Sequence, residues 1–108
     1  MSAAKDKGTR AETAVVRYLQ AQGWPYVERR ASSGCNDKGD IAFPGIVIEV
    51  KSCERMALAA WLDEAEVEAA NAKVDTAVVW HRRKGVASPA DWYVTMSGRT
   101  FVREVLID

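Results

Sequence analysis

The sequence is poor in the side chains that cross-link small domains or bind zinc. Its 108 residues include two cysteines and one histidine, which make neither a tetrahedral zinc set nor a disulfide framework. No apolar run reaches the roughly 18 residues that suggest a membrane-spanning helix, and residues 1–8 lack the apolar core of a secretion signal. We therefore expect no membrane association and a cytoplasmic location, in a bacterial or archaeal cell or in a phage-infected host.

A net charge is also absent, because 15 basic residues are balanced by 15 acidic ones. Strong overall attraction to nucleic acid is therefore not expected. The distribution is uneven: basic residues collect near the start of the chain and again at 82–84, and acids crowd between residues 54 and 75. A molecule with one basic and one acidic face can still dock on a phosphate backbone, so the charge pattern leaves a nucleic-acid partner open.

The apolar content of 48% is typical of a globular chain, and its length predicts one small domain over residues 1–108. Hydrophobic periodicity and turn residues indicate the elements. Helices are expected at 8–22, at 57–73 and from Ser97 on, and strands at 24–31, on both sides of Pro44-Gly45, at 74–81 and at 92–96. The order α-β-β-β-α-β-β-α predicts an α/β fold with a mixed central sheet of about five strands flanked by helices.

The most informative stretch is the hairpin expected at residues 39–51. Folded symmetrically about Pro44-Gly45, it places Asp40 opposite Glu49, with Cβ atoms roughly 4.5–5.5 Å apart. Strand alternation puts Lys51 on the same face as Glu49 and turns Ile48 and Val50 into the core. Two like charges held this close cost stability unless a positive charge lies between them.

Two carboxylates and an amine at one point predict a divalent-cation site that hydrolyses phosphodiesters. Asp40 and Glu49 would bind Mg²⁺, for which Mn²⁺ would substitute, and the Val50 carbonyl would be a third protein ligand. Lys51 would orient the attacking water or stabilise the pentacovalent phosphorane. In the alternative interpretation, Asp40 caps a loop end, and Glu49 and Lys51 form an ion pair on a solvated strand face.

Two further acidic features lie on the expected helices. Glu12 borders the buried stripe of the first helix, from the step of ~100° per residue, and would be a further metal or water ligand. The alternative is a boundary glutamate that extends to solvent. On the second helix, Asp63, Glu64 and Glu68 are expected on the outer face, turned away from any phosphate backbone.

Short motifs in the first half of the chain resemble those of a known family. They are Lys7-Gly8, Glu12, Arg30, Ser32-Ser33-Gly34, Asp40-Ile41 and Ile48-Glu49-Val50-Lys51-Ser52. In order and spacing they resemble the archaeal-type Holliday-junction resolvases of the PD-(D/E)XK nuclease superfamily. The usual proline before the aspartate is Gly39 here.

The resemblance implies a restriction-endonuclease-like core, Mg²⁺-dependent cleavage and a homodimer that places two active sites on a four-way DNA junction. It also implies catalytic roles for Glu12, Asp40, Glu49 and Lys51, and a contact from Ser32 or Ser33 to the scissile region. With the basic residues, the expected DNA contacts are Lys7, Arg10, Arg29, Arg30, Ser32, Ser33, Lys38, Arg82, Arg83 and Lys84.

The function expected is therefore that of a Holliday-junction resolvase, with the last helix and the strand before it as candidates for the dimer interface. One alternative is a nicking or repair nuclease of the same superfamily that acts on flapped or damaged duplex. Another is a DNA-binding subunit that keeps the fold without catalysis. No catalytic role is expected for His81, Cys35 or Cys53.

Overall fold

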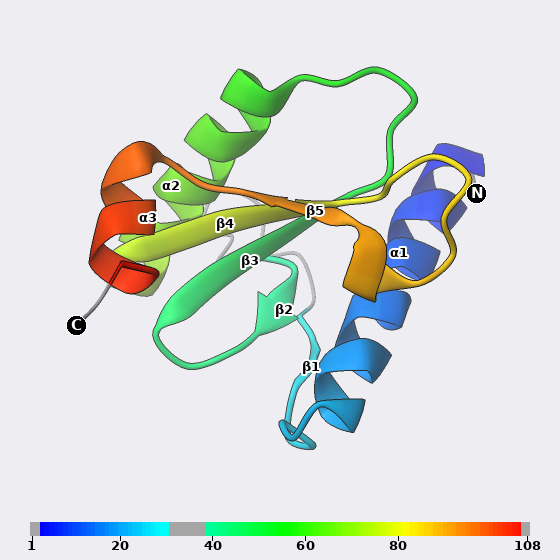
Figure 1. Cartoon of the computed structure of the whole chain (residues 1–108), viewed down its shortest axis with the longest axis horizontal. Coiled ribbons are helices and arrows are strands. Elements are labelled where there is room, and N and C mark those ends of the chain that lie inside the picture. The colour runs from blue at the N-terminus through cyan, green and yellow to red at the C-terminus, as the bar shows by residue number, and fades with distance from the viewer. Residues whose placement is uncertain (1–2, 31–38, 107–108) are drawn as a thin grey trace.

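The computed structural model describes residues 3–30 and 39–106, with side chains from residue 6 onward, and shows a five-stranded sheet with helices on both faces (Figure 1). The helices are α1 (Ala3–Ala21), α2 (Leu58–Ala72), the 3₁₀ helix η2 (Pro89–Asp91) and α3 (Gly98–Glu104). The strands are β1 (Glu28–Arg29), β2 (Ile41–Ala42), β3 (Ile46–Lys51), β4 (Thr76–His81) and β5 (Tyr93–Thr95). The predicted α/β class and the order of the main helices and strands are confirmed; η2 was not predicted.

The strands lie side by side in sequence order, β1-β2-β3-β4-β5. Only β3 and β4 are parallel, and the other neighbours are antiparallel. A parallel pair needs a crossover connection, which α2 provides. In the described residues no helix is both long and apolar enough to cross a membrane.

The predicted register of the hairpin is confirmed. Ile41 of β2 pairs with Ile48 of β3, and in this register Asp40 lies opposite Glu49. Pro44 and Gly45 are the two central residues of the turn. Gly45 has the positive φ, 79°, that the second of these positions requires.

The sheet has an apolar core on each side, and β3 contributes to both. Ile48 and Val50 pack with Val15 of α1 on one face. Val47 packs with Trp61 of α2 on the other. Because side chains alternate along a strand, Glu49 and Lys51 point to the α2 face.

The first predicted strand is much shorter than expected. Of the described residues 24–30, only Glu28 and Arg29 pair with β2, which itself has two residues. The carbonyl of Val27 instead accepts a hydrogen bond of 2.8 Å from the Gln20 side-chain amide of α1. A side chain of α1 therefore satisfies a backbone carbonyl that would pair with a neighbouring strand if β1 were longer.

The expectation that Glu68 faces outward from the second helix is wrong, whereas Asp63 and Glu64 are exposed as predicted. Glu68 is buried. It follows Trp61 by seven residues, which on a helix returns to within about 20° of the same direction. The charge of Glu68 was taken as a sign of exposure, although its position lies on the buried stripe.

Gly39 has a conformation that proline cannot adopt. Its φ is +99°, whereas proline is fixed near −65°. A Cβ at this position would lie 2.9 Å from Cγ1 of Val47. The glycine that replaces the proline of the resembling pattern is therefore required by the local backbone.

Replacing Gly39 with Ala should lower the free energy of unfolding by about 3 kcal/mol, because a strained φ and a steric clash combine. Gly45→Ala is the matched control: its φ is also positive, but no atom lies within 4 Å of the added Cβ, so about 1 kcal/mol is expected. Urea denaturation of both variants measures the difference. Equal losses would show that the Val47 contact has no energetic effect.

Candidate functional site

Asp40 is positioned by two hydrogen bonds to the neighbouring strand. Its backbone N–H donates to the Ile48 carbonyl at 3.2 Å, and its Oδ2 accepts the Val50 N–H at 2.8 Å. The carboxylate therefore takes the place of a strand partner at the point where β2 begins. Its other oxygen remains available for a further partner.

Glu49 lies beside Asp40, close enough for each carboxyl group to shift the pKa of the other. Glu49 is only 3% exposed. Its Oε2 lies 3.6 Å from Nζ of Lys51, and its buried Oε1 has no hydrogen-bond donor among the described residues. Asp40, Glu49 and Lys51 therefore meet on one side of the sheet, as the hairpin register predicts.

Helix α2 adds two carboxylates that the sequence analysis did not assign to the site. Carboxylate oxygens of Glu49, Glu64 and Glu68 all lie within 4.8 Å of one another. Nζ of Lys51 lies 3.4 Å from each Glu64 oxygen. The signal for these residues was present in the sequence as two glutamates four positions apart, which share one face of a helix.

Burial and crowding raise the pKa of two carboxyl groups in this cluster. Burial raises the pKa of the Asp40 carboxyl to about 6, and the Glu12 charge adds to the rise. Burial, and next the Asp40 charge, also raise the pKa of Glu49. Burial lowers the pKa of Lys51, but the Glu49 and Glu64 charges outweigh it, so the net shift is upward and the ammonium stays charged.

Glu12 belongs to the same region, since its charge acts on Asp40. Its Oε1 accepts a bond of 3.0 Å from Nε of Arg29 in β1. Arg29 therefore neutralises one acid of the group, and Lys51 neutralises two others in part.

The residues present fit a divalent cation. A carboxylate oxygen buried without a donor, as in Glu49, needs either a proton or a cation. Mg²⁺ and Mn²⁺ prefer oxygen ligands, and Asp40, Glu49, Glu64 and Glu68 offer only oxygens. In the metal-free protein, the ammonium of Lys51 neutralises part of the negative charge of these carboxylates.

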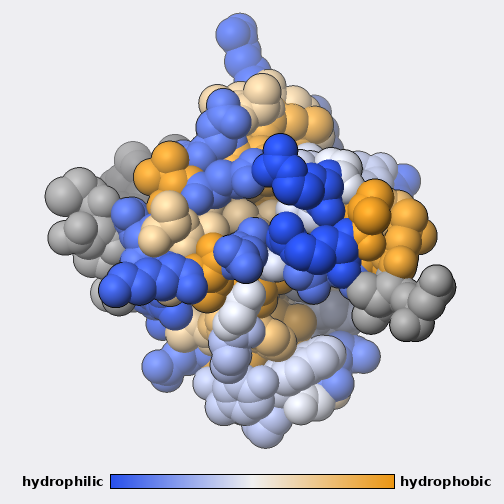
Figure 2. All heavy atoms as spheres, turned by 90° about the vertical axis from the view of Figure 1, so that its left-hand side faces the viewer, coloured by the Kyte–Doolittle hydropathy of each residue, from blue (hydrophilic) through white to orange (hydrophobic). Residues whose placement is uncertain are grey.

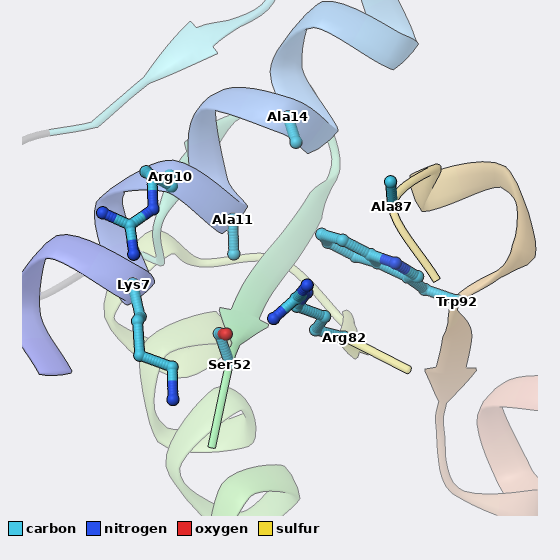
Figure 3. A pocket seen from close by; sticks show the side chains of 8 residues that line it. All are labelled: Lys7, Arg10, Ala11, Ala14, Ser52, Arg82, Ala87 and Trp92. Atoms are coloured by element: carbon cyan, nitrogen blue, oxygen red, sulfur yellow. The ribbon is translucent and has the colours of Figure 1, made fainter. Parts of the chain in front are cut away.

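The expected DNA contacts fall into separate groups. Lys7, Arg10 and Arg82 line one hollow of about 270 Å³ (Figure 3), and Lys84 lines a hollow beside it. Arg30 lines a third, against Phe43. Ser32, Ser33 and Lys38 lie outside the described residues.

Two of the basic residues contact other side chains. The Arg83 guanidinium lies over the ring of Tyr93, 5.6 Å from its centre, and Arg29 pairs with Glu12. His81, for which no catalytic role is expected, is buried with Nε2 2.8 Å from Oγ1 of Thr95.

The end of the molecule that carries α3 exposes apolar side chains. Figure 2 looks onto this end, where hydrophobic groups alternate with strongly hydrophilic ones. The helix is held in place, because Nη2 of Arg103 donates to the Asp75 carbonyl at 3.0 Å. Its exposed apolar residues, with those just after it, are Phe101, Val102, Val105 and Leu106.

Comparison with protein-family models, with curated proteins and with solved structures gives no match. The geometry of the site therefore carries the functional argument.

The metal-free protein should lose stability as the pH rises. A pKa above its unfolded value means that the folded chain binds the proton more tightly. For Asp40 the stabilisation is complete below the unfolded value of 3.8 and is lost as the pH rises through about 6; the upward shift of Glu49 extends the loss to higher pH. Asp40 keeps some water contact, so its share is about 1–2 kcal/mol.

Urea denaturation in EDTA at about pH 5 and about pH 8 measures this loss. Asp40→Asn keeps an oxygen for the Val50 N–H and should reduce the difference between the two pH values. Glu66→Gln, at an exposed position of α2, is the control and should leave it unchanged. A wild-type protein that is more stable at the higher pH would contradict the expectation.

Proposed function

We propose that this protein is a metal-dependent DNA endonuclease of the restriction-endonuclease-like type that acts as a homodimer on branched DNA. The four-way junction is the first substrate to test, and the cytoplasm is the proposed location. The observation that carries the proposal is the meeting of Asp40, Glu49 and Lys51 on one side of β3, around a buried carboxylate oxygen that has no donor in the described part of the chain.

The donor set supports this chemistry. Asp40 and Glu49 would hold a divalent cation, with Glu64 or Glu68 as a further ligand from α2. Bound there, the cation would neutralise charge on the scissile phosphate and make a water molecule more acidic. The backbone N–H of Val50 fixes the Asp40 carboxylate, so that it needs little reorganisation on binding.

Lys51 is proposed as the electrostatic partner of the scissile phosphate. The acids around it raise its pKa, so it acts as a cation and not as a base. It would donate a hydrogen bond to a phosphate oxygen as negative charge grows there. In the free protein it lies near Glu64, and substrate binding would exchange that carboxylate for the phosphate.

A homodimer is supported by the apolar face of α3 and by the position of β5. An unpaired edge strand and contiguous exposed apolar residues are features of association surfaces. β5 is at the edge of the sheet, and Tyr93 and Val94 on it are exposed. Two chains would supply the two sites that symmetric cleavage of a junction requires.

Cleavage of labelled DNA in Mg²⁺ tests the activity. Wild type should cut a four-way junction, and Asp40→Asn should cut at least about a hundredfold more slowly while still binding, as expected for the loss of a metal ligand. EDTA should abolish cleavage by the wild type. Glu66→Gln is the matched control with full activity.

The choice of substrate separates the alternatives. Paired symmetric nicks in the junction alone support resolution, and faster cleavage of flapped or nicked duplex supports a repair nuclease. Junction binding without any Mg²⁺- or Mn²⁺-dependent cleavage would overturn the nuclease proposal and leave a DNA-binding subunit.

Light scattering after size-exclusion chromatography tests the dimer. Val102→Glu should convert the dimer into a monomer, because a charge in the centre of an apolar interface is left unpaired. Val67→Glu is the control, since Val67 is a similarly exposed valine on α2, and it should remain dimeric. A wild type that is monomeric at about 50 μM, a concentration at which a dimer with micromolar affinity would form, would contradict this part of the proposal.

A further inference from the structure

The hollow beside the end of β3 has the composition of an anion site. It lies between α1 and the segment that follows β4, on the side of the sheet opposite the carboxylates (Figure 3). Lys7 and Arg10 project from α1 on one side, Arg82 lies on the other, and Ser52 lies between them. Ala11 and Trp92 complete the walls.

The three cations of this hollow are not neutralised by acids. In the part of the chain that the structure describes, the ion pairs use Arg29, Lys51 and Arg103. Lys7, Arg10 and Arg82 form none. Among the described residues no acid lines this hollow, so three positive charges face it, and Glu54 lines only the hollow beside it.

Two of the walls are fixed by hydrogen bonds. The backbone N–H of Arg82 donates to the Lys51 carbonyl at 2.9 Å, which continues the parallel pairing of β3 and β4 and places Arg82 beside Ser52. The indole N–H of Trp92 donates to the Val86 carbonyl at 2.7 Å. The backbone of Arg82 and the indole of Trp92 are therefore held in place before binding, which lowers the cost of binding.

A second hollow, of about 240 Å³, continues from the first and shares Lys7, Ser52 and Arg82 with it. It adds Lys84, Cys53 and Glu54. A ligand whose charged group fills the first hollow could thus extend along a second basic surface.

We propose that the first hollow binds the terminal phosphate of a DNA strand. A guanidinium binds phosphate oxygens through paired N–H donors, and a hydroxyl and an ammonium supply single donors. A terminal phosphate carries about −1.5 to −2 charges at neutral pH, which matches three cations better than the single charge of an internal diester. An internal diester must also leave the hollow on two sides, whereas a terminal phosphate leaves on one.

This inference rests on the proposed nuclease function, which identifies the phosphate as part of a nucleic acid. It also narrows the range of DNA substrates. Ser52 follows Lys51 directly, so the hollow begins at the residue after the lysine of the candidate site, on the other face of the sheet. Intact four-way junctions have no strand end at the branch. Nicked or flapped DNA can carry one, so the proposal favours branched DNA with a phosphorylated end near the branch.

Binding of labelled duplexes with a single-strand nick, in EDTA, tests the inference without cleavage. Three duplexes differ only at the nick, which carries a 5′-phosphate, a 3′-phosphate or hydroxyl groups alone. Wild type should bind one phosphorylated duplex about tenfold more tightly than the hydroxyl form, as expected for a charge-assisted contact. Arg82→Gln should reduce this ratio to below about threefold, and Arg82→Lys should restore part of it.

Arg17→Gln is the matched control. Arg17 is an exposed arginine of α1 that lines neither hollow, so the ratio should be unchanged. Urea midpoints equal to that of wild type show that the variants are folded. Arg82 is exposed, so loss of folding is not expected.

Equal binding of all three duplexes by wild type would overturn the inference. Inorganic phosphate that competes as strongly as the phosphorylated nick would also overturn it, because the ligand would then be a small anion. A protein that fails to cleave any DNA but keeps the preference for a phosphorylated nick would refute the nuclease and leave this site standing. An active nuclease without the preference would refute the site alone.

Discussion

The hydrogen bond from the Val50 N–H to the Asp40 carboxylate is the contact on which the candidate site depends. Strand β2 has only two residues, so backbone pairing alone gives little control over the segment before it. The 2.8 Å bond continues the pairing through a side chain. It holds the half-buried Asp40 against Glu49, and burial of Glu49 and Glu68 then creates the demand for positive charge that Lys51 meets only in part.

Much of this arrangement was readable from short-range patterns. The Pro44-Gly45 turn fixes the hairpin register, and the register with strand alternation places Asp40, Glu49 and Lys51 together. The order of elements followed from hydrophobic periodicity. These features depend on residues close in sequence, so local rules suffice. The same rules placed the start of the last helix at Ser97, whose hydroxyl accepts the Thr100 N–H.

The predictions that were wrong or missing concern features that depend on contacts between segments distant in the sequence. Helix α2 packs Trp61 and Ala65 against β3 and β4. Glu68 lies on the same face of the helix and is therefore buried with them. The strand expected at 24–31 is short because its partner β2 is short. Neither the strands that cover Glu68 nor the shortness of β2 can be recognised from the residues next to the affected segment. The hollow formed by Lys7, Arg10 and Arg82 likewise joins residues more than seventy positions apart, which no motif in the sequence connects.

The distribution of charge around β3 affects how the protein meets a polyanion from a distance. Acids gather on the α2 side and unpaired cations on the α1 side, so a chain with a formal charge of zero still has a dipole moment. The field of a nucleic acid would orient this dipole before contact, with the cationic side leading. Association would therefore slow as ionic strength rises, a dependence that the balanced composition alone does not suggest.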